Sequence, residues 1–261
     1  MPQNIYQAVW IFIIYAFLGW CSEVAFAAVN KGKFVNRGFL NGPVCPIYGV
    51  GMLIVVLCLW NLRDRPLLLF LGSALLTTAL EFVTGFVLER FFHDKWWDYS
   101  EQPLNIGGYV CVLFSLIWGV FCVLIVKIIH PLIYKVLTMI PLVLGIVVMA
   151  CLAVGLLADL YVTASGILKM NRRLEAMEKI AAELKELSDK VGENIYENVM
   201  EGMEFREEKK ARIEELKAKY EEMAENRTKV GERLVKAFPK MQVGQHKEIF
   251  EELRERIKRS K

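Results

Sequence analysis

Residues 5–29, IYQAVWIFIIYAFLGWCSEVAFAAV, form an apolar run that a single acid, Glu23, interrupts. Hydrocarbon about 30 Å thick requires roughly 20 mostly apolar helical residues, so this run predicts a transmembrane helix. Four more apolar runs follow it, of which the first is short. The predicted spans lie near residues 5–29, 47–62, 67–88, 107–129 and 136–162. The predicted fold is therefore an all-α, polytopic membrane protein of about five transmembrane helices.

The charges divide the chain into two predicted domains. Residues 1–165 hold 9 Lys and Arg and 8 Asp and Glu, whereas residues 166–261 hold 23 and 21. The first part is predicted to be the transmembrane domain and the second a charged helical tail. Because acids and bases nearly balance in the tail, it lacks the basic excess of nucleic-acid-binding proteins, and nucleic acid is not an expected partner.

Orientation follows from the loop charges, since Lys and Arg near span ends are retained in the cytoplasm. The loops after spans one and three, with the start of the tail, carry more of them than the opposite loops. The two sets are Lys31, Lys33, Arg37, Arg90, Lys95, Lys169, Arg172 and Arg173 against Arg63, Arg65, Lys127 and Lys135. We predict a multi-pass protein of the bacterial inner (cell) membrane, embedded in the lipid bilayer, with its N-terminus outside and its tail cytoplasmic.

Two acids lie where lipid disfavours charge. Glu23 falls in the inner half of span one, and Glu81 lies near the middle of span three. An ionised side chain in a bilayer is costly unless it is paired or hydrated, so each is a candidate for a substrate path. The alternative is a structural ion pair, and Arg37 is the expected counter-ion of one of them. Asp159, near the end of span five, is interpreted as an interfacial acid in water.

Each intramembrane acid precedes a similar loop, which suggests a duplication. The order is acid, polar loop, proline, glycine, cysteine, then an aromatic residue followed by glycine. The first copy contains Asn36, Gly38, Gly42, Pro43, Cys45, Pro46, Tyr48 and Gly49, and the second contains Trp97, Asp98, Tyr99, Asn105 and Trp118. Parallel repeats build the central site of some transporters. A chance match of Gly, Pro and aromatic residues is the alternative, and Trp96, Trp97 and Tyr99 also suit anchors at the headgroup level.

These loop motifs resemble a known family. The segments are NRGFL at 36–40, GP at 42–43, CPIYG at 45–49, WDYS at 97–100, and Ser115 with Trp118-Gly119. They are similar to the ABC-transporter type IV, or CmpB-like, permease family over roughly residues 5–165. The resemblance implies a transport component of the membrane. The chain departs from ordinary permeases in having no long cytoplasmic coupling loop between its spans.

The sequence gives no sign of catalysis. No Gly-x-x-x-x-Gly-Lys-Ser/Thr loop is present, so ATP-driven transport would require a separate ATPase subunit. The cysteines show no Cys-x-x-Cys spacing and suit small buried side chains. His93, Asp94 and Asp98 are interpreted as hydrated interfacial residues. We expect no enzyme activity, no catalytic residue, no metal site and no cofactor.

The tail carries two apolar series with heptad spacing. One runs from Leu174 through Leu184 to Ile195, and the other runs from Ile213 to Leu234. Gly192 and Gly202 weaken the helix between them and Pro239 ends the second series, so an antiparallel hairpin or a bent coiled coil is expected. Residues 246–259 suit a further amphipathic helix. Such seams favour partner binding or a homo-oligomer formed through the tail.

Two functions remain open from the sequence. The first is a transport component, an ABC-type permease without its own ATPase, whose site includes Glu23, Arg37 and Glu81. The second is a membrane-anchored scaffold or sensor that presents the tail to a cytoplasmic partner. The acids discriminate between them, because a scaffold has no need of carboxylates within the bilayer.

Overall fold

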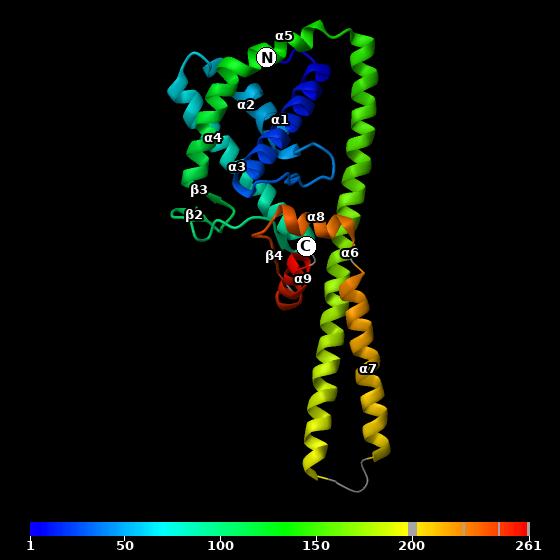
Figure 1. The fold of residues 1–261 in the computed structure, drawn as a ribbon. Coiled ribbons are helices and arrows are strands. Elements are labelled where there is room, and N and C mark those ends of the chain that lie inside the picture. The colour runs from blue at the N-terminus through cyan, green and yellow to red at the C-terminus, as the bar shows by residue number, and fades with distance from the viewer. Residues whose placement is uncertain (198–202, 227, 245, 260–261) are drawn as a thin grey trace. The chain divides into compact units, whose positions relative to one another are not determined.

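The computed structural model describes residues 1–197, 203–226, 228–244 and 246–259. Most of them are helical (Figure 1). The helices are α1 (Ile5–Lys31), α2 (Pro46–Leu59), α3 (Pro66–Phe92), α4 (Val112–Leu124), α5 (His130–Met139), α6 (Leu142–Glu197), α7 (Met203–Glu225), α8 (Lys229–Ala237) and α9 (Lys247–Arg259). The strands are β1 (Asp94–Lys95), β2 (Asn105–Ile106), β3 (Val110–Cys111) and β4 (Gln242–Val243). The predicted all-α class is confirmed.

The chain divides into two compact units. Unit 1 comprises Met1–Ala164 and Arg233–Gln242, and unit 2 comprises Ser165–Glu232 and Val243–Lys261. Residues 233–242 therefore belong with the apolar helices, although they lie in the charged tail. The charge pattern of the sequence did not predict this return of the chain.

Four helices are long and apolar enough to cross a membrane by length and composition. They are Ile5–Lys31, Pro66–Phe92, Val112–Met139 and Leu142–Lys190. A fifth apolar helix, Pro46–Leu62, is shorter and ends in the 3₁₀ turn Trp60–Leu62. It begins at Pro46, where the missing N–H of proline costs nothing, after an extended Cys45. The polytopic character predicted from hydropathy is confirmed.

The last two apolar helices differ in their bounds from the predicted spans 107–129 and 136–162. Gly107 and Gly108 have φ angles of 60° and 73°, which glycine adopts without strain, and they turn β2 back onto β3. The fourth helix thus begins only at Val112 and continues through the π-helical turn Ile125–Ile129 into α5. It ends at Met139, because Pro141 disfavours helix at the residue before it, and Ile140 is extended.

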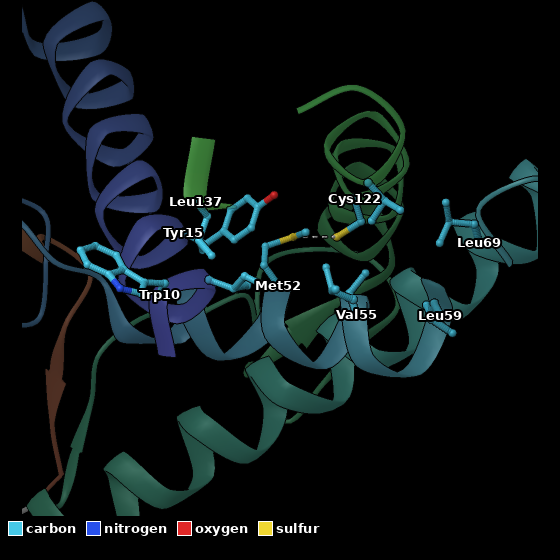
Figure 2. Packing of buried hydrophobic residues seen from close by; sticks show 11 residues of the cluster. Trp10, Tyr15, Met52, Val55, Leu59, Leu69, Cys122 and Leu137 are labelled. Atoms are coloured by element: carbon cyan, nitrogen blue, oxygen red, sulfur yellow. Dashed lines mark hydrogen bonds between the residues drawn. The ribbon is translucent and has the colours of Figure 1, made fainter. Parts of the chain in front are cut away.

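The core of unit 1 forms where α2 packs between α1 and α3, and α3 packs on α4. Its members are almost wholly shielded from solvent (Figure 2). They are Trp10, Ile11, Tyr15, Met52, Val55, Val56, Leu59, Leu69, Cys122, Val126 and Leu137. The Sγ atom of Cys122 lies 4.0 Å from the Sδ atom of Met52, so α2 and α4 meet at the centre of this core.

Unit 2 contains an antiparallel helical pair. The C-terminal half of α6 lies beside α7, and Arg212 forms ion pairs with Glu183 across the pair and with Glu215 on its own helix (Figure 1). Leu174 of the first predicted series and Leu216 of the second are both buried. Each predicted series thus contains a buried apolar residue.

The second predicted tail helix is interrupted. Helix α7 ends at Glu225, and α8 begins at Lys229, where the Thr228 Oγ1 atom accepts a hydrogen bond from the Gly231 N–H at 3.2 Å. A threonine N-cap of this kind starts a new helix. Gly192 lies within α6, whereas Gly202 falls outside the described residues. Helix α9 agrees closely with the predicted helix 246–259.

Candidate intramembrane site

Glu23 in α1 anchors the first half of a polar centre. The Tyr48 hydroxyl donates a hydrogen bond to its Oε1 atom at 2.5 Å, and the Nε atom of Arg37 lies 3.2 Å from its Oε2 atom. Among the described residues the Nε–H group of Arg37 has no hydrogen-bond partner, so this contact is an ion pair by distance alone. The guanidinium also lies 5.2 Å from the centre of the Phe26 ring. Carboxylate, guanidinium, hydroxyl and aromatic ring thus converge here.

The first loop, residues 33–45, presents Arg37 through the side chain of Asn36. The Asn36 Oδ1 atom accepts hydrogen bonds from Trp20 Nε1 at 2.8 Å and from the Gly38 N–H at 3.0 Å. Its Nδ2 atom donates to the Asn41 carbonyl at 2.7 Å. One asparagine therefore fixes the loop to itself and to α1, which explains why a segment without regular structure holds a charged residue in place.

Glu81 in α3 anchors the second half. The Tyr99 hydroxyl lies 3.3 Å from its Oε1 atom and donates to it. The Oε2 atom is buried and has no hydrogen-bond partner within the described part of the chain. Burial, followed by the charge of Glu81, raises the pKa of Tyr99 above its usual range, so this hydroxyl remains a proton donor. The Tyr99 ring stacks on Phe114 with 4.9 Å between ring centres.

The two halves are built on one plan. A Cβ atom at Gly49 would lie 3.0 Å from the Ala16 Cβ, and a Cβ atom at Gly119 would lie 3.1 Å from the Ala74 Cβ. Each glycine thus lets its helix approach the preceding one closely at an alanine. Glu23 follows Ala16 by seven residues, and Glu81 follows Ala74 by seven. The acids therefore occupy equivalent positions in the helix pairs α1–α2 and α3–α4.

Equivalent residues also contact each other across the two pairs. Tyr48 and Trp118, which directly precede the two glycines, have ring centres 5.3 Å apart. Met52 and Cys122, three residues after the glycines, are the sulfur pair in the core (Figure 2). Residues at the same distance from the two glycines thus contact each other at two successive turns of α2 and α4. We call the two acids, their tyrosine partners and Arg37 the polar centre.

A strap, residues 233–242, ties down the first loop. Arg233 Nη1 donates to the Gly38 carbonyl at 2.7 Å, Nη2 donates to the Phe39 carbonyl at 2.8 Å, and Nε donates to Asn41 Oδ1 at 2.9 Å. The planar fork of arginine matches two consecutive carbonyl groups in a way that lysine does not. Burial lowers the pKa of Arg233, yet an arginine remains charged in proteins.

The strap also contacts the second loop, residues 93–111. Gln242 Nε2 donates to Asp98 Oδ2 at 2.9 Å, and β4 pairs with β1. The Phe238 ring meets Trp96 edge-on with 5.2 Å between ring centres, and Trp96 is only 3% exposed. Trp96 is therefore enclosed by protein rather than serving as the headgroup anchor that the sequence suggested. One short segment binds the loops of both repeats.

Asp159 of α6 holds the first loop from another direction. Its carboxylate accepts hydrogen bonds from the backbone N–H groups of Asn41 at 3.0 Å and Gly42 at 2.6 Å. The Asn41 side chain and the Thr163 hydroxyl add two more, at 2.8 Å and 3.2 Å. The interpretation of Asp159 as a hydrated interfacial acid does not describe these contacts, since the residue fastens the loop to a helix.

The predicted site residues separate into two groups in the structure. Glu23, Arg37, Glu81, Tyr48, Tyr99 and Trp118 lie at the polar centre, although Arg37 pairs with Glu23 and not with Glu81. The others shape the loops and helix starts: Asn36, Gly38, Gly42, Pro43, Cys45, Pro46, Gly49, Trp97, Asp98 and Asn105. In this second group, Trp97 Nε1 donates to the Tyr109 carbonyl at 2.8 Å, and Asn105 Nδ2 donates to the Gln102 carbonyl at 2.8 Å.

Sequence reasoning missed Arg233. It lies in the second apolar series of the tail, surrounded by other charged residues, and no local pattern separates it from its neighbours. Only the return of the chain to the first loop gives it a role. Asp159 was visible as an acid near the end of a span, but its backbone partners lie more than a hundred residues earlier.

The fold and the site together define a polytopic α-helical membrane protein with a polar centre shared by two equivalent helix pairs. The sequence profile of the family described as "Putative ABC-transporter type IV" matches residues 10–164, and the chain belongs to this family. The matched region contains both helix pairs and both loops, so the predicted family is confirmed. Neither the curated proteins nor the solved structures contain a match to the chain.

Proposed function

We propose that the chain is the permease subunit of an ABC-type transporter and that a separate polypeptide supplies the ATPase. The family is one of ABC-transporter type, and the four long apolar helices supply a membrane component. In this proposal the solute passes the polar centre formed by Glu23, Arg37 and Glu81. Loop charges favour an N-terminus outside and a tail in the cytoplasm of the bacterial inner membrane.

The observation that carries the proposal is the pair of equivalent carboxylates. Glu23 and Glu81 lie within helices that are apolar enough to cross a membrane, at matching positions of two helix pairs. A charge in the bilayer interior costs several kcal/mol unless a partner or water compensates for it. A polar centre on the axis between two parallel repeats is where transporters of repeated architecture bind their solutes.

The strap supports a route by which a partner ATPase could be coupled to both loops. Spans that are joined by short loops offer no long cytoplasmic helix on which an ATPase could dock. The strap contacts both loops, so these three segments share one face of unit 1. We place this face in the cytoplasm, where movement of the strap by a partner would act on both repeats at once.

Topology and partner can be tested together. Cysteine substitutions at Lys33 and Lys95 should be labelled only from the cytoplasm, and a substitution at Arg63 should be labelled from outside. Affinity purification from native membranes, followed by mass spectrometry, should recover an ATPase subunit in stoichiometric amount. Loops found on opposite faces, or a native preparation that contains no ATPase, would contradict the proposal.

The second candidate is a membrane-anchored scaffold or sensor. It is favoured by the charged helices of unit 2, in which ion pairs join Arg256 of α9 to Glu221 of α7 and Arg212 of α7 to Glu183 of α6. The substitutions Glu23→Gln and Glu81→Gln separate the two functions. Transport predicts that at least one variant loses its cellular phenotype while the protein stays folded and abundant. Full function in both variants would favour the scaffold.

A further inference from the structure

The two equivalent carboxylates of the polar centre have different partners. Glu23 has an internal cation, the guanidinium of Arg37, together with the Tyr48 hydroxyl. Glu81 has the Tyr99 hydroxyl on Oε1, and its buried Oε2 atom has no hydrogen-bond partner among the described residues. Glu23 thus has a positively charged partner, whereas the corresponding acid, Glu81, has only a hydroxyl partner among the described residues.

The groups around Glu81 suit a cation. Tyr99 donates to one carboxylate oxygen and leaves the other for a second donor. Its ring stacks on that of Phe114, which holds this hydroxyl in position. No lysine or arginine of the described ranges forms an ion pair with Glu81. A carboxylate in an apolar helix is costly unless a positive partner, water or a proton compensates for its charge, and the described residues supply no positive partner.

We propose that Glu81 binds the positively charged group of a small solute, of guanidinium or ammonium type, in the way that Glu23 binds Arg37. The first helix pair demonstrates the recognition chemistry: a carboxylate that accepts a hydrogen bond from a tyrosine hydroxyl pairs with a guanidinium, which also lies over the ring of Phe26. Guanidinium groups match carboxylates in geometry and are weakly hydrated, so they enter such sites at low desolvation cost. This inference names the substrate class of the transport site and rests on the proposed function for its biological meaning.

The asymmetry also gives the two acids distinct roles. Glu23, already neutralised, holds the first loop through Arg37, whereas Glu81 is free to exchange its partner. The titratable and charged groups that face Glu81 are the hydroxyls of Tyr99 and Tyr48 and, across the polar centre, Glu23. None of these is a cation, so a positively charged solute meets no charge repulsion from them.

Carbodiimide labelling tests the site in the full-length purified protein. A hydrophobic carbodiimide modifies buried carboxyl groups, and mass spectrometry identifies the modified residue. Methylguanidinium is the probe, and methylurea is its neutral counterpart of similar shape. With a Kd of about 1 mM, as a single charged contact gives, about 10 mM methylguanidinium should lower the labelling rate of Glu81 roughly tenfold. Methylurea at the same concentration should leave it unchanged.

Glu89 provides an internal control. It lies on the same helix, and the Tyr109 hydroxyl donates to it at 2.8 Å. Its labelling should change less than about twofold, which is the range of nonspecific salt effects on exposed charges. Methylguanidinium should also raise the Tm of the wild type and of Glu89→Gln, but not that of Glu81→Gln.

The outcomes separate this inference from the proposed function. Selective protection of Glu81 by methylguanidinium supports a cation site. Labelling of Glu81 that neither methylguanidinium nor ethylammonium alters would overturn it and leave a carboxyl group that binds a proton only. In that case an ATPase partner and a transport phenotype of Glu81→Gln would still support the permease. Protection in a protein that has no ATPase partner would sustain the cation site and refute the permease instead.

Discussion

The three hydrogen bonds of Arg233 allow a quantitative test of the strap. The substitution Arg233→Lys keeps the positive charge but removes the planar fork that reaches the carbonyl groups of Gly38 and Phe39. An ammonium group at the end of a flexible chain can replace one of the three contacts. At least two acceptor oxygens of the first loop then lose their protein donor, and Arg233→Ala removes the donors of all three.

The magnitude follows from the number and type of bonds lost. A hydrogen bond from a charged donor contributes about 1.5–3 kcal/mol, and bonds within one network are not additive. Because Arg233 is only half-buried, water compensates in part, and we take about 3–4 kcal/mol for Arg233→Ala and about 2 kcal/mol for Arg233→Lys. At roughly 2–4 °C per kcal/mol for a unit of this size, Arg233→Ala should lower Tm by about 6–16 °C.

Thermal denaturation in detergent, followed by size-exclusion chromatography of the remaining monodisperse protein, measures this shift. The matched control is Arg90→Lys, since Arg90 is an exposed arginine at the end of α3. Its Tm should change by less than about 4 °C, as exposed charges contribute less than about 1 kcal/mol. If Arg233→Ala melted within about 1 °C of the wild type, the strap would contribute nothing, and the energetic reasoning would be refuted.

Gly49→Ala should lower the free energy of unfolding by about 2–3 kcal/mol, because its new Cβ would lie 2.5 Å from a backbone oxygen. Gly119→Ala should lower it less, because the new Cβ would lie 2.9 Å from an aromatic ring, which can move. Gly155→Ala, with nothing within 4 Å, should be neutral or stabilising, and equal Tm values for all three would contradict the repeat packing. Hydrogen bonds from Ser100, and then the charge of Lys95, lower the pKa of Asp98 in the folded protein. The stability that the Asp98 carboxylate contributes is therefore complete above its unfolded pKa of about 3.9, and it is lost as the pH falls through the lower folded pKa. Asp98→Asn should therefore melt below the wild type at pH 7, with a difference that closes on acidification, and a constant difference would exclude this role. Leu216→Asp buries a charge in unit 2 and should cost about 3 kcal/mol or more, which limited proteolysis of the full chain detects as faster cleavage in α7.

Hydropathy predicted the architecture well because the bilayer imposes one simple rule on every span. The bounds of α1 and α3 lie within a few residues of prediction, and α2 begins at Pro46, one residue before the predicted span. The fourth and fifth helices deviated where local backbone chemistry overrides hydropathy. Gly107 and Gly108 form a hairpin turn inside an apolar run, and Pro141 sets a break that average hydropathy does not register.

The candidate site was predictable as far as charge in an apolar context identifies a residue. Glu23, Glu81 and Arg37 were found in this way, and the repeat suggested that the acids correspond. The sequence did not show which acid pairs with Arg37, because Glu23 and Glu81 were equally suitable partners. The contacts of Asp159 and Arg233 could not be predicted either, since each depends on backbone groups of a loop distant in sequence. Side chains that bind backbone leave no pairing signal in a single sequence.

The strap has a consequence for how the chain is made. The first loop leaves the ribosome about two hundred residues before its Arg233 partner is synthesised, a delay of roughly 10–40 s at about 5–20 residues per second. During that interval the apolar helices can enter the membrane, but both loops lack the segment that joins them. A product of premature termination would thus lack the segment that joins the two loops, and proteases should cleave these loops more readily. Unit 1 can therefore be completed only after translation has passed residue 242.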